Sequence, residues 1–159
     1  MIRVGLGFDA HGFDAERPLI LGGALISGHA GLGGHSDADA VLHAITDALL
    51  GAIGAGDIGE HFPSSDARWK GADSSKFVKE ALRLVYERKA TISNLDVTIV
   101  AEEPRLAPHR AAIRQSIADL LDLSVELVNV KATTTDGMGF LGRGEGIAAM
   151  AIVALELHS

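Results

Sequence analysis

The segment that most constrains the fold is residues 147–157, which are apolar at nearly every position. Successive side chains of a strand point to opposite faces of its sheet, so a strand without polar alternation has both faces covered. We therefore expect this segment to be the central strand of a sheet. Its longest apolar run, Ile147 to Leu155, is about half of the roughly 20 residues that span a bilayer, so we expect no membrane helix.

Three more stretches have the pattern of strands, and they are residues 2–9, 95–99 and 128–134. A small hairpin is expected at residues 19–26, because Gly22-Gly23 separates two apolar triplets and permits the positive φ angles of a tight turn. Residues 95–99 alternate apolar and polar side chains, as half-buried strands do. Together these segments predict a mixed, four-stranded sheet with an additional hairpin.

Helical periodicity of apolar residues predicts three helices, which begin at Ser36, Asp73 and Pro108. The predicted inner face of the second helix carries Phe77, Ala81, Leu84 and Val85. Ser36 is followed three residues later by Asp39, a spacing typical of a capping box. Proline suits the first turn of a helix, because no backbone N–H is needed there. Glycine-rich stretches predict loops at residues 29–34, 55–72 and 137–146.

Interleaved strands and helices, without repeats or a linker, predict one domain over residues 1–159. The expected class is α/β (α+β): a two-layer sandwich with a mixed four-stranded sheet, helices on one face and the small hairpin. The other face of that sheet is too apolar to meet water. We therefore expect a homo-oligomer that buries this face against copies of the same chain.

Composition excludes several classes of protein. The formal net charge is −7 and no basic run is present, which disfavours binding to nucleic acid. There are no cysteines, so a disulfide framework, a thiolate metal site and a cysteine nucleophile are excluded. The N-terminus enters a strand pattern without an apolar or Arg/Ser-rich leader, and we therefore expect a cytoplasmic protein.

Three residues have the types and spacing of a metal site. Asp9 and His11 lie two apart at the end of a strand pattern, so their side chains share one face. His43 lies on the first helix, in a polar stripe with Asp39 and Asp47 opposite the apolar stripe. Two imidazoles and a carboxylate suffice for a catalytic zinc ion and leave one position free. Spacing alone leaves open that the Asp-x-His pattern is coincidental and that His43 is a surface histidine.

Other motifs suggest phosphate chemistry. Glycine-rich loops at residues 31–36, 57–59 and 137–146 let backbone N–H groups approach phosphate oxygens, although ordinary turns share this composition. Residues 131–136 place three threonines and an aspartate at a strand end. They either bind phosphate and a cation or belong to a strand rich in β-branched residues. Residues 5–10 imitate a dinucleotide fingerprint, but Gly12 and the polar residues after it cannot open the required helix.

Six stretches together resemble one known family. They are residues 7–11, 35–43, 57–59, 70–74, 129–135 and 142–146, and they are spread over essentially the whole chain. In this order they resemble the 2-C-methyl-D-erythritol 2,4-cyclodiphosphate synthases of the non-mevalonate route to isoprenoids. The resemblance implies a lyase that closes 4-diphosphocytidyl-2-C-methyl-D-erythritol 2-phosphate into a cyclic diphosphate and releases CMP. It also implies a homotrimer, with sheets around the trimer axis and active sites between neighbouring subunits.

The resemblance assigns two metal ions to this chain. It implies that Asp9, His11 and His43 bind Zn²⁺ or a similar divalent cation. A second ion, Mg²⁺ or Mn²⁺, would bridge the diphosphate and contact Asp136. The zinc ion would orient the β-phosphate and withdraw charge from it.

The resemblance also assigns residues to the substrate. Positions that stabilise the transition state match His35 and Thr134. The implied substrate-binding residues are Ser36, Asp57, Ile58, Gly59, Phe62, Pro63, Ser64, Ser65, Asp66, Phe140 and Arg143. The implied cytidine-nucleotide site comprises Ala101, Glu102, Glu103, Pro104, Arg105, Leu106, Ala107, Ala132 and Thr133. Phe8, Arg143 and Glu145 match residues that line a cavity on the trimer axis, which can hold an isoprenoid diphosphate. For Arg143 and Glu145, an ordinary salt bridge is the alternative.

Three positions depart from the family pattern. Asp136 stands where Glu is usual, Ser64 where many relatives carry Asp, and Arg105 where Lys is common. Two rival functions also fit the motifs. One is a metallohydrolase that uses Asp39 or Asp47 as a general base for water. The other is a trimeric nucleotide- or isoprenoid-binding module whose histidines are structural.

Overall fold

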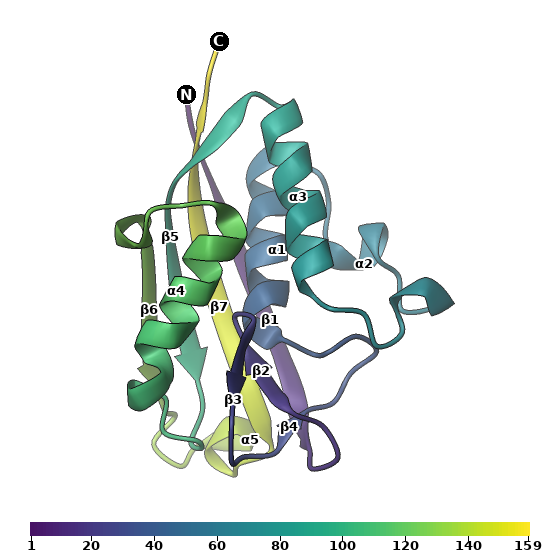
Figure 1. Ribbon diagram of the computed structural model, residues 1–159, viewed down its shortest axis with the longest axis vertical. Coiled ribbons are helices and arrows are strands. Elements are labelled where there is room, and N and C mark those ends of the chain that lie inside the picture. The colour runs from purple at the N-terminus through teal and green to yellow at the C-terminus, as the bar shows by residue number, and fades with distance from the viewer.

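The computed structural model describes residues 1–159, and a five-stranded mixed sheet forms its centre (Figure 1). The strand order is β4-β1-β7-β5-β6. The strands are β1 (Ile2–Asp14), β4 (Gly31–Leu32), β5 (Ala90–Val100), β6 (Val128–Thr133) and β7 (Gly146–Leu157). β7 pairs antiparallel with both β1 and β5, so the prediction that the apolar C-terminal segment is central is confirmed. β5 and β6 run parallel, which makes the sheet mixed.

The expected fold class is confirmed, with one strand more than predicted. The additional strand is β4, whose two residues lie in a glycine-rich stretch that we predicted to be a loop. They pair with Phe13 and Asp14. β1 continues beyond its predicted end at Asp9 because residues 10–12 pair with β7 and the last two residues pair with β4. The predicted hairpin is also present as β2 (Leu19–Leu21) and β3 (Ala24–Ile26), and both glycines of its turn have positive φ.

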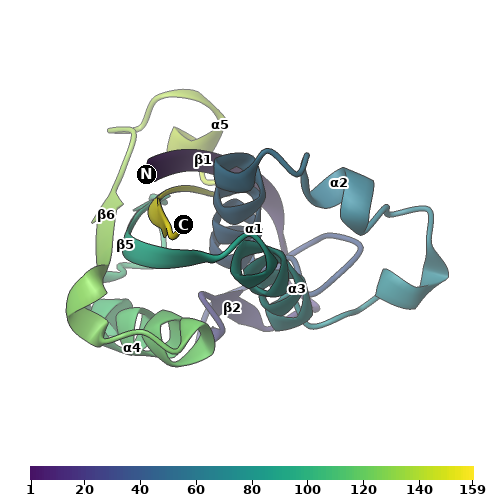
Figure 2. The ribbon, with the colours of Figure 1, turned by 90° about the horizontal axis from the view of Figure 1, so that it is seen from above.

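Three long helices lie on one side of the sheet, as Figures 1 and 2 show. They are α1 (Ala40–Ile53), α3 (Ser75–Glu87) and α4 (Arg110–Leu121). The shorter elements are α2 (Ile58–His61), α5 (Gly139–Gly142) and three 3₁₀ turns, η1 (Ala67–Trp69), η2 (Ala107–His109) and η3 (Val125–Leu127). α2, η1 and α5 lie within stretches that we predicted to be loops. No helix combines the length and the apolar character that crossing a membrane requires.

The first helix begins later than predicted, and the capping-box prediction was wrong. Asp39, not Ser36, is the N-cap of α1, and its side chain accepts a hydrogen bond from Leu42 N. The same buried carboxylate accepts hydrogen bonds from the hairpin turn, at 2.9 Å from Gly22 N and 2.7 Å from Gly23 N. Asp39 therefore ties the hairpin to the helix, a long-range contact that local spacing does not reveal.

The starts of the other two long helices are shifted as well. Ser74 rather than Asp73 is the N-cap of α3, although its hydroxyl makes no capping hydrogen bond. Pro108 lies in η2, the single turn directly before α4. The predicted inner face of α3 is present nevertheless, because Phe77 and Val85 are buried.

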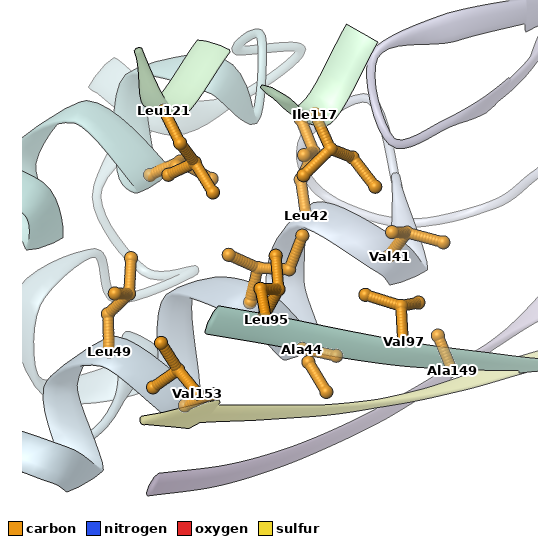
Figure 3. Packing of buried hydrophobic residues seen from close by; sticks show 14 of the residues in the cluster. Val41, Leu42, Ala44, Leu49, Leu95, Val97, Ile117, Leu121, Ala149 and Val153 are labelled. Carbon is orange, nitrogen blue, oxygen red and sulfur yellow. The ribbon is translucent and has the colours of Figure 1, made fainter. Parts of the chain in front are cut away.

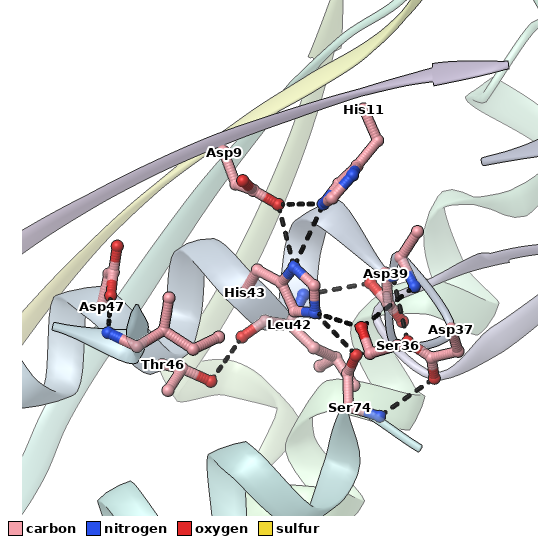
Figure 4. Close-up of polar contacts among 12 residues, drawn as sticks. Asp9, His11, Ser36, Asp37, Asp39, Leu42, His43, Thr46, Asp47 and Ser74 are labelled. Atoms are coloured by element: carbon pink, nitrogen blue, oxygen red, sulfur yellow. Dashed lines mark hydrogen bonds and ion pairs between the residues drawn. The ribbon is translucent and has the colours of Figure 1, made fainter. Parts of the chain in front are cut away.

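The backbone of α1 comes unusually close to β1. A Cβ atom built on Gly7 would lie only 1.8 Å from the carbonyl oxygen of Ala44, and a second glycine two residues earlier meets the next turn of the helix in the same way. Only a residue without a side chain permits this contact. The close approach brings Asp9, the next residue on this face of β1, beside His43 of α1 (Figure 4).

Aliphatic side chains fill the space between the sheet and the helices. Figure 3 shows Leu42 and Leu49 of α1, Leu95 and Val97 of β5 and Ile117 of α4 meeting between the layers. They belong to one continuous cluster that includes residues of all three long helices. Because such interiors are densely packed, the relative positions of β1 and α1 are fixed by the core.

The opposite face of β1 and β7 is apolar and exposed. Val4, Leu6 and Phe8 are 63%, 64% and 57% exposed, and Met150 and Ile152 are 40% and 48% exposed. These residues form the uncovered apolar face that the sequence predicted. Contiguous exposed apolar surface of this kind marks an association surface.

Candidate active site

Asp9, His11 and His43 meet at one point of the structure, as Figure 4 shows. The Oδ2 atom of Asp9 lies 2.8 Å from His11 Nε2 and 3.0 Å from His43 Nδ1. The two imidazole nitrogens are 3.2 Å apart. No other three His, Asp or Glu side chains of the chain come close enough together to share an ion. The predicted cluster is therefore present as a potential metal site.

The donor atoms have nearly the spacing that a metal ion requires. Tetrahedral bonds of about 2.0–2.1 Å would place neighbouring ligand atoms about 3.3 Å apart. The observed separations of 2.8, 3.0 and 3.2 Å are slightly shorter, so small outward movements of the side chains would admit an ion. Two imidazoles and one carboxylate therefore fit a divalent cation in both chemistry and geometry.

Regular secondary structure positions all three side chains. Asp9 and His11 share the face of β1 that meets α1, although they lie inside the strand rather than at its end as predicted. His43 lies on the first turn of α1. The remaining ring nitrogen of His11, Nδ1, donates a hydrogen bond to the Gly33 carbonyl oxygen at 3.0 Å. That contact leaves the lone pair of Nε2 free for a metal.

The cluster is electrostatically prepared for a cation. Burial raises the pKa of Asp9, but hydrogen bonds from His11 and His43 outweigh this effect and hold that pKa below its ordinary value. The hydrogen bond to Asp9 is in turn the main reason that the pKa of His11 is raised. Asp9 is thus ionised at neutral pH, and its negative charge favours a positive partner between the two imidazoles.

The polar stripe predicted on α1 is only partly present. Asp39 does not face the site, because its carboxylate is fully buried among three backbone N–H donors, and burial raises its pKa to about 6. Asp47 accepts a hydrogen bond from Ile58 N at 2.8 Å and so holds the start of α2. Neither carboxylate contacts the side chains of the cluster (Figure 4). Both carboxylates thus accept hydrogen bonds from backbone N–H groups outside the cluster.

The cluster lines a cavity of about 310 Å³. The other lining residues are His35, Ser36, Ile58, Gly59, Phe62, Ser64, Trp69 and Phe77. All of these except Trp69 and Phe77 were predicted to act on the substrate. The structure thus brings segments from β1, α1, α2 and the preceding loops around one space.

Trp69 and Phe77 are the two lining residues of this cavity that the sequence did not predict, and both are aromatic. The rings of Phe62 and Phe77 are 4.5 Å apart, and that of Trp69 lies 5.1 Å from Phe62. Trp69 falls in a predicted loop, and Phe77 was assigned to the inner face of a helix. Phe62, Trp69 and Phe77 occur within one stretch of a chain with only 4% aromatic residues, and this local enrichment is the sequence signal that would have indicated them.

Four predicted substrate residues lie beside this cavity without lining it: Asp57, Pro63, Ser65 and Asp66. Asp57 caps α2 by accepting a hydrogen bond from Glu60 N at 2.9 Å. Asp66 caps η1 by accepting one from Arg68 N at 2.9 Å. Both carboxylates thus shape the loop that borders the cavity.

A second cavity, of about 190 Å³, lies at the other predicted site. Its lining residues are Ala101, Glu102, Pro104, Arg105, Leu106, Ala107, Arg110, Ala132, Thr133 and Thr134. The structure therefore brings together all of the predicted cytidine-nucleotide residues except Glu103. Arg110 was not predicted, and it adds a second cation beside Arg105.

The two cavities have no lining residue in common. Thr134 and Asp136 come directly after β6, where Asp136 N donates a hydrogen bond to Thr134 Oγ1 at 3.1 Å and Asp136 has a positive φ of 54°. Neither residue lines the cavity that contains the Asp9, His11 and His43 cluster. One chain by itself thus keeps the two predicted metal positions apart.

The predicted trimer-axis residues and Phe140 lie outside both cavities. Arg143 Nε donates to Glu145 Oε2 at 2.8 Å, so the salt bridge that we considered as the alternative is present. Phe8 lies on the exposed apolar face, and Phe140 is 48% exposed. These side chains are available to contact another copy of the chain.

Comparison with known proteins decides the family. A family model described as the YgbB family matches residues 2–156. The chain belongs to the YgbB family. A relative from Idiomarina loihiensis, named 2-C-methyl-D-erythritol 2,4-cyclodiphosphate synthase, is 53% identical over 155 residues, which cover 98% of each chain. The resemblance stated from the sequence motifs is therefore confirmed.

Some relatives in the YgbB family are longer. The bifunctional enzyme IspD/IspF of Erythrobacter litoralis is 57% identical over 150 residues, which are 94% of this chain and 39% of the relative. The present chain thus spans about two fifths of the length of such bifunctional relatives.

Solved structures agree with this assignment. The bifunctional IspDF of Campylobacter jejuni matches with a TM-score of 0.95 and 43% identity, over 100% of this chain and 43% of that one. A Plasmodium falciparum IspF in complex with CDP matches with a TM-score of 0.87 and 32% identity, over 99% of this chain and 97% of that one. The architecture of the YgbB family is thus shared along the whole chain.

Proposed function

We propose that residues 1–159 form one cyclodiphosphate synthase domain that works in the cytoplasm. It would convert 4-diphosphocytidyl-2-C-methyl-D-erythritol 2-phosphate into 2-C-methyl-D-erythritol 2,4-cyclodiphosphate and CMP, in non-mevalonate isoprenoid biosynthesis. The observation that carries this proposal is the cluster of Asp9, His11 and His43 at the wall of a cavity, in a chain 53% identical to a named synthase along 98% of its length.

The proposed reaction is an intramolecular phosphoryl transfer. An oxygen of the 2-phosphate bonds to the β-phosphorus, and the bond between that phosphorus and the oxygen that leaves with CMP breaks. The attacking group and the electrophile are both anionic. The protein must therefore neutralise charge and hold the reacting atoms in line.

We assign Zn²⁺ to the cluster, because two imidazoles and a carboxylate form a zinc donor set that leaves a fourth position open. When bound, the ion polarises a phosphoryl oxygen of the substrate. We assign the second ion, Mg²⁺ or Mn²⁺, to the diphosphate near Asp136, since these ions prefer oxygen ligands. Asp136 is one methylene shorter than the usual Glu, so we expect it to reach that ion through a water molecule.

Residues of the cavity at the Asp9, His11 and His43 cluster (the metal cavity) would bind and orient the erythritol phosphate. Ser36 offers a hydroxyl beside the cluster, and Gly59 lets a phosphate approach the backbone. Phe62 would cover the apolar side of the sugar and exclude water. His35 and Thr134 would donate hydrogen bonds to phosphoryl oxygens as negative charge develops.

Residues of the second cavity would bind the cytidine nucleotide. Backbone groups of residues 101–107 can read the edge of a pyrimidine, and Ala132 and Thr133 lie opposite. Arg105 provides positive charge for the phosphates. Two solved relatives are described with CDP, which supports this assignment.

A complete site requires the two cavities to meet, and we propose that a homotrimer brings them together. The exposed apolar face of β1 and β7 would be buried around the trimer axis, as an uncovered sheet face demands. Phe8, Arg143 and Glu145 would then surround a cavity on that axis. We propose an isoprenoid diphosphate as its ligand, with Arg143 leaving Glu145 to bind the phosphates.

Phosphorus NMR of the product tests the proposed reaction. The protein loaded with Zn²⁺ and Mg²⁺ should convert the cytidyl substrate into CMP and a cyclic diphosphate, and EDTA should stop turnover. An open-chain phosphate beside CMP would identify a hydrolase instead. Unchanged substrate, together with CDP affinity that EDTA does not alter, would identify a binding module.

A further inference from the structure

The two ring nitrogens of His43 lie in different surroundings. Nδ1 faces the cluster, 3.0 Å from Asp9 Oδ2. Nε2 faces away from it, 2.8 Å from Ser74 Oγ and 3.1 Å from Ser36 Oγ (Figure 4). A histidine can bind a metal through one nitrogen only when that nitrogen has a free lone pair. The groups around Nε2 therefore decide whether Nδ1 is ready for an ion.

The direction of the hydrogen bonds around Ser74 is set by its second partner. Ser74 Oγ donates to Asp37 Oδ1, and Ser74 N donates to Asp37 Oδ2 at 3.0 Å. An ionised carboxylate can only accept, so the single hydroxyl proton of Ser74 points to Asp37. The oxygen of Ser74 is then an acceptor on the side of His43. Nε2 must carry a proton to donate to it. When an ion takes the place of the proton through which Nδ1 bonds to Asp9, the lone pair of Nδ1 is then available to that ion.

The position of Ser74 in the fold supports a dedicated role for its hydroxyl. Ser74 is the N-cap of α3, where serine normally accepts a hydrogen bond from the first turn, yet it makes no such bond. Its side chain is completely buried and is directed at His43 and Asp37 instead. The hydroxyl thus forgoes the local stabilisation of a cap for a contact with the cluster.

We propose that Asp37 and Ser74 form a relay that holds His43 with a proton on Nε2 and the lone pair of Nδ1 directed at the metal position. Both are positioning residues, since they act on the ion only through His43. The inference rests on the proposed metal site. It gives a task to two residues of the motifs at 35–43 and 70–74 for which the sequence suggested none.

Metal affinity tests the relay independently of turnover. Zn²⁺ binding is measured by competition with a chromophoric chelator in wild type, Ser74→Ala and Ser75→Ala. Loss of an outer partner of a ligating histidine typically weakens metal binding by about 10- to 100-fold, and we expect Ser74→Ala to fall in this range. Ser75→Ala is the matched control, because the neighbouring serine makes no contact with His43, and its affinity should equal that of wild type.

A spectroscopic measurement distinguishes positioning from general stability. In the zinc-loaded, ¹⁵N-histidine-labelled protein, His43 should show a slowly exchanging Nε2–H proton in wild type and in Ser75→Ala. The signal should be lost to solvent exchange in Ser74→Ala. Asp37→Asn is measured in parallel, in case the buried Ser74→Ala substitution prevents folding. It removes the carboxylate that orients the hydroxyl, so affinity and signal should both weaken.

The outcomes separate this inference from the proposed function. If wild type binds zinc tightly and the folded variants keep its zinc affinity and its Nε2–H signal, the relay alone is overturned. A wild-type protein that binds no zinc would overturn the proposed metal site, and the relay with it.

Discussion

The metal cavity and the cavity that we propose for the cytidine nucleotide (the nucleotide cavity) are built in different ways. The side chains of the potential metal site lie on β1 and α1, whose backbones are in contact at Gly7 and whose positions are fixed by the core. The nucleotide cavity is formed mainly by the loop 101–107 and by the exposed end of β6. Regular secondary structure thus carries the side chains that must keep a fixed geometry, and a loop carries the backbone groups that we assign to the cytosine base.

The cavities also differ in completeness. The potential metal site assembles within one chain, whereas the nucleotide cavity shares no lining residue with the metal cavity. If both act on one substrate, a neighbouring copy must join them. Substitutions should therefore separate into those that affect metal binding, those that affect assembly and those that affect nucleotide binding.

The largest effect is expected from His43→Ala, which removes a metal ligand. Turnover should fall by at least about 1000-fold, since loss of the ion would remove both its contact with the reacting phosphoryl group and its positive charge. The proposed trimer and the proposed CDP binding should persist, because the substitution leaves the nucleotide cavity and the exposed apolar face unchanged. His158→Ala is the control, since the exposed side chain of that histidine forms its hydrogen bond with Thr91, away from both cavities. Release of CMP by His43→Ala at the wild-type rate would show that the site is misplaced.

Leu6→Glu should separate assembly from metal binding. A carboxylate on the exposed apolar face would prevent close packing of copies, so light scattering should report monomers. Turnover should fall by about 100-fold or more because the neighbouring cavity is misplaced, whereas zinc affinity should be retained. Leu25→Glu is a matched control, because Leu25 is also 64% exposed but lies on the hairpin. Trimers of Leu6→Glu with full activity would contradict the proposed interface.

Gly7→Ala should disturb the metal cavity through the backbone. The added Cβ atom would meet the Ala44 carbonyl oxygen at 1.8 Å, and neither backbone can yield freely. We expect a loss of about 1–3 kcal/mol in unfolding free energy, together with weaker zinc binding. Gly51→Ala provides the contrast, since its Cβ would meet nothing within 4 Å. It should stabilise α1 by about 0.5–1 kcal/mol in denaturant titrations. Equal stability of the two variants would disprove the close contact.

Arg105→Ala should have the smallest effect and should leave the metal cavity unchanged. Loss of one charged contact to the nucleotide phosphates should weaken CDP binding by about tenfold in calorimetry. Zinc affinity should remain that of wild type. Arg83→Ala serves as the control, because Arg83 pairs with Glu80 on the outer side of α3, away from both cavities. A parallel loss of zinc affinity in Arg105→Ala would show that the cavities are coupled within one chain.

Local sequence patterns predicted the layout of the fold but not its long-range contacts. The unbroken apolar run of β7 identified the central strand, and the Gly-Gly turn identified the hairpin. The start of α1 was mispredicted because Asp39 is held by the hairpin turn as well as by its own helix. The end of β1 was mispredicted because the residues after Asp9 pair with β7 and β4, which are separate segments of the sequence.

The cluster of the potential metal site was predictable for a physical reason. Strand alternation places Asp9 and His11 on one face, and the predicted helix supplied His43. Their partners were less accessible to prediction. Ser74 follows the residue at which its helix was predicted to begin, and Trp69 lies in a predicted loop. Only the tertiary structure shows that Ser74 contacts His43 and that Trp69 lines the cavity. Roles that depend on a neighbour from another segment are therefore visible only in three dimensions.

The most direct measurement is zinc K-edge X-ray absorption on the purified protein, combined with metal analysis. We expect about one zinc ion per chain, bound by two imidazoles and one carboxylate at about 2.0–2.1 Å, with a fourth light-atom ligand. The same spectrum should be absent from His43→Ala. A protein that retains no zinc, or a zinc ion without imidazole ligands, would contradict the metal centre proposed at Asp9, His11 and His43.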